Sequence, residues 1–150
     1  MSQDRETLLD HFKATRETFM AAIEGLKPEQ MMEPSIDGWS VKDHMLHIAT
    51  WDEIRAAEVS RISAGFESAW RMTEEQDEVF NNMSYELRKA LSYEQAVHEI
   101  VNSRINLLAA IRDATDRGLD ETLYGEAGLV SSHELEHAEW IRAWRERLGI

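Results

Sequence analysis

Two histidines near the end of the chain, His133 and His137, are four residues apart. On a helix this spacing places both imidazoles on one face, with their Cβ atoms about 6 Å apart, so that one metal ion can bind both. A third histidine, His47, lies on an apolar stripe with Trp51 and Ile54, and we expect it to face the core too. Three imidazoles with a free coordination position are typical of a catalytic metal site, where the ion activates water or a thiol. The pattern predicts a divalent metal site.

The histidines also allow an interpretation without metal. Histidine pairs at this spacing are common on helices by chance, and a buried imidazole is often a hydrogen-bonded core residue. His44, one turn before His47, is an alternative ligand, a neighbour that supports the ligands, or a surface residue. The six histidines also include His98, which we expect to be partly exposed. Metal centre and hydrogen-bonded core both stay open at this point.

Several aromatic and acidic residues fall near the predicted site. Trp51, Trp140 and Trp144 recur at helical spacing around the histidines, and they either line a small-molecule pocket or belong to the core. Glu58 shares the helical face of His47 and is a candidate general base. Glu134 and Glu136, next to the histidine pair, are further candidates, and for all three the bland alternative is a surface acid, because acids are frequent on every helix of this chain.

The elements that must position these residues are all predicted to be helices. Apolar residues recur at three- and four-residue steps over residues 5–26, 40–65, 93–115 and 131–148. A Ser or Thr followed three residues later by Asp, Gln or Glu predicts a capped start at Ser40, Thr73, Ser92 and Ser131. Thr73 would begin an additional helix over about 74–88, inside the long connection 66–92. Sustained period-two alternation, the mark of strands, is absent from the sequence.

This pattern predicts one all-α domain over residues 1–150. Four long amphipathic helices form a four-helix bundle, with a long connection, holding a further helix, between the second and third. A length of 150 residues suits a single domain with one sizeable core.

Composition excludes several classes of function. The formal charge of −13 argues against a nucleic-acid partner, because such proteins present basic clusters. The absence of cysteine excludes disulfides and thiolate ligands, which leaves imidazole and carboxylate to hold a metal. No apolar run approaches the roughly 20 residues that span a bilayer, and the polar start is unlike a signal peptide. We therefore expect a cytoplasmic protein without membrane contact.

Two segments resemble signatures of the DinB-like superfamily. Residues 38–51, GWSVKDHMLHIATW, resemble its second-helix motif, and residues 132–144, SHELEHAEWIRAW, resemble its fourth-helix motif. The middle of the chain, DEVFNN at 77–82 and SYEQ at 92–95, is similar to the branch that includes the ClbS/DfsB four-helix-bundle proteins. The likeness extends over nearly the whole chain.

The resemblance implies a zinc or nickel ion held by three histidines, at positions that match His47, His133 and His137. It implies a hydrolase or a thiol S-transferase, in which water or a low-molecular-weight thiol attacks an electrophilic small molecule. Many members are homodimers, so we expect one here. The alternative is a metal-free bundle that binds or sequesters a toxin or drug without chemistry.

Overall fold

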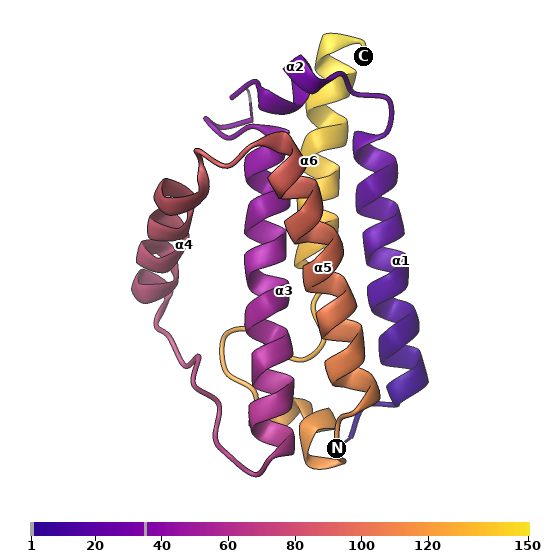
Figure 1. Cartoon of the computed structure of the whole chain (residues 1–150), viewed down its shortest axis with the longest axis vertical. Coiled ribbons are helices and arrows are strands. Elements are labelled where there is room, and N and C mark those ends of the chain that lie inside the picture. The colour runs from indigo at the N-terminus through magenta and orange to yellow at the C-terminus, as the bar shows by residue number, and fades with distance from the viewer. Residues whose placement is uncertain (1, 35) are drawn as a thin grey trace.

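The computed structural model describes residues 2–34 and 36–150 of the chain. Four long helices stand side by side as a bundle, with a shorter helix, α4, outside it next to α3 (Figure 1). The described residues contain no β-strand, so the predicted all-α class with four long helices is confirmed. The elements in chain order are α1 (Arg5–Ile23), α2 (Pro28–Met32), α3 (Val41–Ser63), α4 (Glu74–Arg88), α5 (Tyr93–Arg112), the 3-10 turns η1 (Arg117–Leu119) and η2 (Glu121–Leu123), and α6 (His133–Leu148).

Capping residues set where the helices begin. Ser40, Thr73 and Ser92 each accept a hydrogen bond from a backbone amide three residues on, as predicted. These boxes make α4 and α5 two separate helices. The predicted box at Ser131 is wrong, because Ser132 precedes α6 without a side-chain cap and the carboxylate of Glu134 turns into the core instead.

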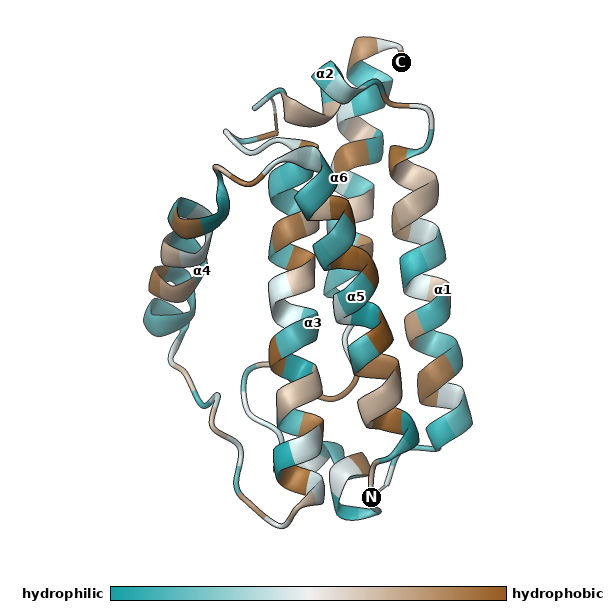
Figure 2. Ribbon diagram, in the orientation of Figure 1, coloured by the Kyte–Doolittle hydropathy of each residue, from teal (hydrophilic) through white to brown (hydrophobic). Residues whose placement is uncertain are grey.

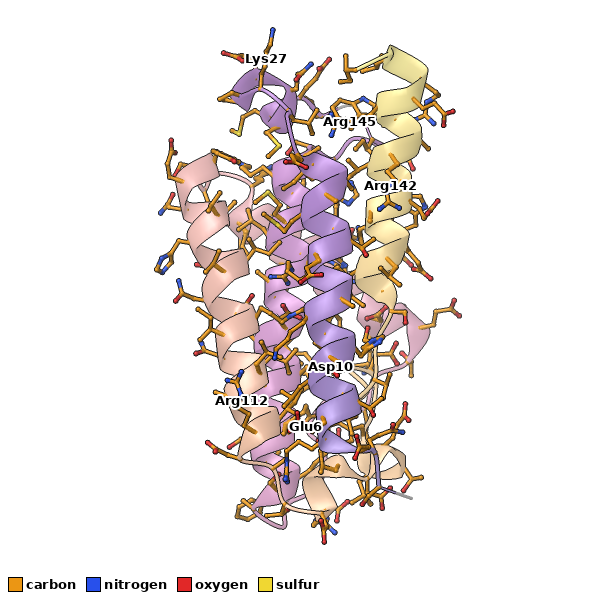
Figure 3. The ribbon with its side chains drawn as sticks, turned by 90° about the vertical axis from the view of Figure 1, so that its right-hand side faces the viewer. Glu6, Asp10, Lys27, Arg112, Arg142 and Arg145 are labelled. Atoms are coloured by element: carbon orange, nitrogen blue, oxygen red, sulfur yellow. The ribbon has the colours of Figure 1, made fainter. Side chains whose placement is uncertain are left out.

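The core lies between the four long helices, where α3 packs against α5 and α1 against α6. Hydrophobic and hydrophilic residues are interspersed along each of these helices (Figure 2). This is the pattern of helices that bury one face and expose the other. Not every apolar residue of these helices is buried: on α5, Val101 is 47% exposed, whereas Leu107 is fully buried. At the far end of α6, Arg145 donates to the carbonyl oxygens of Ala22 and Glu24, which finishes α1 (Figure 3).

A buried network of charges crosses the middle of the bundle. Asp52 on α3 accepts from Arg16 of α1 at 2.7 Å and from Arg104 of α5 at 3.0 and 3.1 Å. The same two guanidinium groups hold Glu134 of α6, at 2.5 and 2.8 Å. Both carboxylates are almost completely buried. Four helices are therefore joined through two buried carboxylates and the guanidinium groups that pair with them.

Among the residues that the structure describes, no helix is both long enough and apolar enough to cross a membrane.

Replacing Asp52 by Asn should lower the free energy of unfolding by about 3 kcal/mol, because the guanidinium groups of Arg16, Arg55 and Arg104 all lose one carboxylate partner. Urea denaturation measures this change. Glu139→Gln is the matched control, since Glu139 is 74% exposed in its ion pair with Arg142, which Figure 3 labels on α6, and we expect a change below about 0.5 kcal/mol. Equal effects of the two substitutions would contradict a structural role for the network.

Candidate metal centre

The structure brings the three predicted histidines together. One ring nitrogen from each of His47, His133 and His137 can be chosen so that all lie within 4.8 Å of one another. The Nε2 atoms of His133 and His137 are 3.1 Å apart. His47 comes from α3 and the other two from the first turns of α6, which begins partway up the bundle after a long loop (Figure 1). The cluster forms where these two helices run past each other.

Burial keeps these imidazoles neutral. Loss of solvation, reinforced by neighbouring histidines, lowers the pKa of His47 to about 3 and the pKa of His137 still further. The pKa of His133 is also lowered by desolvation, although its side chain is 42% exposed. A neutral imidazole offers a free nitrogen lone pair, which is the form that binds a metal.

The fourth histidine of the site, His44, lies behind His137. The Nδ1 atoms of the two rings are 2.7 Å apart, so one of them donates a proton to the other. The other ring nitrogen of His44, Nε2, is buried without a hydrogen-bond partner in the described structure. When His137 uses Nε2 for a metal, its proton must sit on Nδ1 and point at His44. His44 thus holds His137 as a supporting neighbour, one of the three roles that the sequence left open.

An open cavity of about 280 Å³ adjoins the histidines. Trp140 of α6 lies on its wall and is 48% exposed, as expected for a pocket residue. Trp51, also expected there, lines two neighbouring cavities instead. Trp144 is a correction: it packs with the apolar core cluster and is almost fully buried, because it lies one further turn along α6 from the cavity.

Trp39 supplies a second aromatic wall, held by a tight turn. Ile36 and Trp39 exchange two backbone hydrogen bonds of 3.0 Å, and Asp37 and Gly38 between them have φ angles of 53° and 87°. Positive φ at both central positions is the mark of a type I′ turn and favours glycine. The turn sets the Trp39 ring 5.3 Å from His44 and 5.2 Å from His47.

Helix α4 covers another side of the site through polar and aromatic contacts. Asn81 accepts a 2.9 Å hydrogen bond from Trp51 Nε1 and lines the cavity. Tyr85 stacks on Trp39 at 5.5 Å, and Arg88 donates to Thr50 at 2.6 Å. None of the residues of α4 is buried. Helix α4 therefore contributes side chains to the candidate site and adds no fully buried residue to the core.

The acids proposed from sequence have other roles. Glu58 is fully buried, accepts from the Ser68 hydroxyl and from the backbone amides of Ala69 and Trp70, and pairs with Arg61. Its carboxylate holds the connection after α3 in place. Because its oxygens already accept these hydrogen bonds, its assignment as a general base is wrong. Glu134 belongs to the buried charge network.

Sequence reasoning missed the contribution of Trp39 and Asn81 to the site and left His44 undecided. Asp37 and Gly38 are typical turn residues, but helical periodicity does not tell where a turn places the side chain of the residue that follows it. Asn81 lies on a helix outside the bundle, whose docking depends on contacts between distant residues.

The comparisons with known proteins agree with this architecture. The model of the DinB superfamily matches residues 11–141, and the chain belongs to that superfamily. The structure is also similar to the crystal structure of an uncharacterised protein from Escherichia coli UTI89, with a TM-score of 0.80 and 18% identity over 99% of this chain and 96% of that chain. This likeness concerns the fold. None of the curated proteins matches the sequence.

The three histidines fit a divalent ion by the chemistry of their nitrogen atoms, and the pair on α6 fits it by distance as well, while the nitrogen of His47 lies within 4.8 Å of both. Two nitrogens bound to one tetrahedral zinc at 2.0–2.1 Å lie about 3.3 Å apart, close to the 3.1 Å between the Nε2 atoms of His133 and His137. Imidazole suits zinc, nickel, copper and iron alike, so the donor set alone does not select the metal.

Replacing His44 by Phe should weaken zinc binding about 10- to 100-fold, because His137 loses the partner that fixes its tautomer. Competition with a chromophoric chelator measures this affinity. His98→Ala is the control, since His98 is exposed on α5 and contacts Asn102. If zinc affinity stays within twofold in both variants, His44 does not support the site.

The buried histidines should make the metal-free protein sensitive to acid. Below about pH 6.5 the unfolded chain binds protons on these imidazoles while the folded chain does not, so stability is lost as pH falls. His47→Leu removes one such group, because the pKa of His47 is lowered to about 3. Between pH 6 and 5 it should reduce the slope of unfolding free energy against pH by up to about 1.4 kcal/mol per unit. Urea midpoints of wild type, His47→Leu and His98→Ala test this, and an unchanged slope in His47→Leu would contradict it.

Proposed function

We propose that this protein is a metal-dependent enzyme in which His47, His133 and His137 hold a divalent transition metal, zinc or nickel. Its substrate would be an electrophilic small molecule, attacked by water or by a low-molecular-weight thiol. The observation that carries the proposal is the convergence of three neutral imidazoles from two helices on one edge of an open cavity.

The open cavity favours a catalytic over a purely structural ion. Structural zinc sites are closed by four protein ligands, whereas catalytic sites keep a position for water or substrate. Within the described residues, a cluster of three histidines is found here without a cysteine or carboxylate as fourth ligand. When bound, the ion would supply Lewis-acid activation of a water or thiol at neutral pH.

The surrounding side chains supply orientation and shelter. Trp39 and Trp140 offer flat apolar surfaces beside the histidine cluster, on which an organic substrate can lie. Asn81 presents an amide at the same cavity and can donate to a substrate oxygen through its Nδ2, because its Oδ1 is engaged by Trp51. The Nδ1 atom of His137 is hydrogen-bonded to His44, and this contact fixes the orientation of the His137 ring.

Protein purified without a polyhistidine tag should contain close to one equivalent of a transition metal, and His137→Ala should lower this to less than about 0.2 equivalents, because two imidazoles rarely retain an ion that needs three or four ligands. Mass spectrometry of the elements in dialysed protein gives the stoichiometry. His98→Ala is the matched control and should keep its metal.

A wild-type content of only a few tenths of an equivalent, unchanged in His137→Ala, would exclude the proposal. It would favour the alternative function, a metal-free bundle that binds a small molecule, in which the contacts among His44, His133 and His137 are hydrogen bonds of the core.

A further inference from the structure

A second cavity, of about 190 Å³, lies on the other side of His133. It shares His133 and Asn81 with the aromatic cavity, so the two cavities flank the candidate metal centre. Its volume is below the roughly 300–1,000 Å³ of pockets that take a drug-sized ligand, so the cavity suits a small polar group. Unlike the aromatic cavity it is lined by three residues that carry formal charges.

Arg55 of α3 supplies the positive charge. Its Nε and Nη2 atoms donate to the carbonyl oxygens of Ala127 and Gly128. Its Nη1 atom lies 3.6 Å from Asp52 Oδ1, longer than a hydrogen bond. The side chain is almost completely buried and yet lines the cavity. Nη1 therefore makes no hydrogen bond within the described structure, and the cavity is a space beside this side chain in which a ligand could supply an acceptor.

Asp77 and Glu126 supply two negative charges to the cavity from two distant parts of the chain. Asp77 comes from the first turn of α4, and Glu126 from the loop before α6, where its backbone amide donates to Trp70 O at 2.6 Å. Over the described residues, neither carboxylate makes an ion pair with a lysine or arginine. Asp77 and Arg55 both act on His133 electrostatically, which places them close to the metal centre.

We infer that this cavity is a subsite for the α-amino-acid end of a zwitterionic small molecule. Its carboxylate would accept from Arg55 Nη1, and its ammonium group would lie between Asp77 and Glu126. A carboxylate alone would meet two like charges, and an amine alone would leave the Arg55 donor unmatched. A ligand with both groups satisfies all three side chains, and Trp51 offers it an apolar wall.

The role of this subsite in a reaction rests on the proposed function, although binding of the ligand does not. A molecule anchored by its amino-acid end beside His133 would extend its remaining atoms toward the metal centre, while the aromatic cavity remains free for another molecule. The arrangement therefore allows two small molecules, one of them an amino-acid derivative, to lie on either side of the candidate metal centre at the same time.

The experiment compares three probes of similar size on metal-free and on zinc-loaded protein. L-alanine carries both charged groups, ethylamine lacks the carboxylate, and propionate lacks the ammonium group. The readout is the NMR signal of the Trp51 indole N–H, assigned with Trp51→Phe, because this group borders the cavity and donates to Asn81. Arg55 also pairs with Asp52, so omission of the ligand carboxylate, rather than substitution of Arg55, tests its part.

We expect L-alanine to bind at least fivefold more tightly than either half, and Asp77→Asn and Glu126→Gln each to weaken it at least fivefold. Glu75→Gln, in the same turn of α4 but away from the cavity, should bind like wild type. The inference is overturned if L-alanine up to 50 mM does not shift the signal, if either half binds within fivefold of it, or if Asp77→Asn or Glu126→Gln weakens it less than fivefold.

A zinc titration of the same samples separates the two hypotheses. Protein that binds L-alanine but not zinc keeps the subsite and loses the proposed enzyme, whereas protein that binds zinc but not L-alanine does the reverse.

Discussion

Two buried carboxylates, Asp52 on α3 and Glu134 on α6, share the guanidinium groups of Arg16 and Arg104. This network fixes how the two histidine-bearing helices face each other. Asp52 lies five residues after His47, and Glu134 directly follows His133. Because buried charges tolerate little displacement from their partners, the rotation of α6 against α3 is set, and the imidazoles are directed to one place.

The histidine cluster is a consequence of that constraint. Packed imidazoles lose solvation, so protonation is disfavoured and their lone pairs stay free. The ring of His44 supports His137 from behind, and the tight turn before α3 lays Trp39 over the cluster. Helix α4 adds Asn81 and Tyr85 from outside the bundle. The helices of the bundle thus position the three histidines, and the segments that connect these helices supply much of the lining of the pockets.

Much of this could be predicted from sequence, for reasons of local physics. The caps at Ser40, Thr73 and Ser92 and the apolar periodicity are short-range signals, and they located the helices and the inward face of His47. The charge network could not be predicted, because Asp52 and Arg104 look like the many surface charges of this acidic chain until their partners are known. Trp144 and Glu58 failed similarly: helical spacing showed the face on which they lie, but not what that face meets.

The most direct test is an anomalous-scattering map from crystals of the protein grown with zinc, collected on both sides of the zinc absorption edge. The structure predicts one strong peak about 2.0–2.1 Å from a nitrogen of each of His47, His133 and His137. A map with no peak there, and with the three rings turned so that their nitrogens cannot share an ion, would contradict the account.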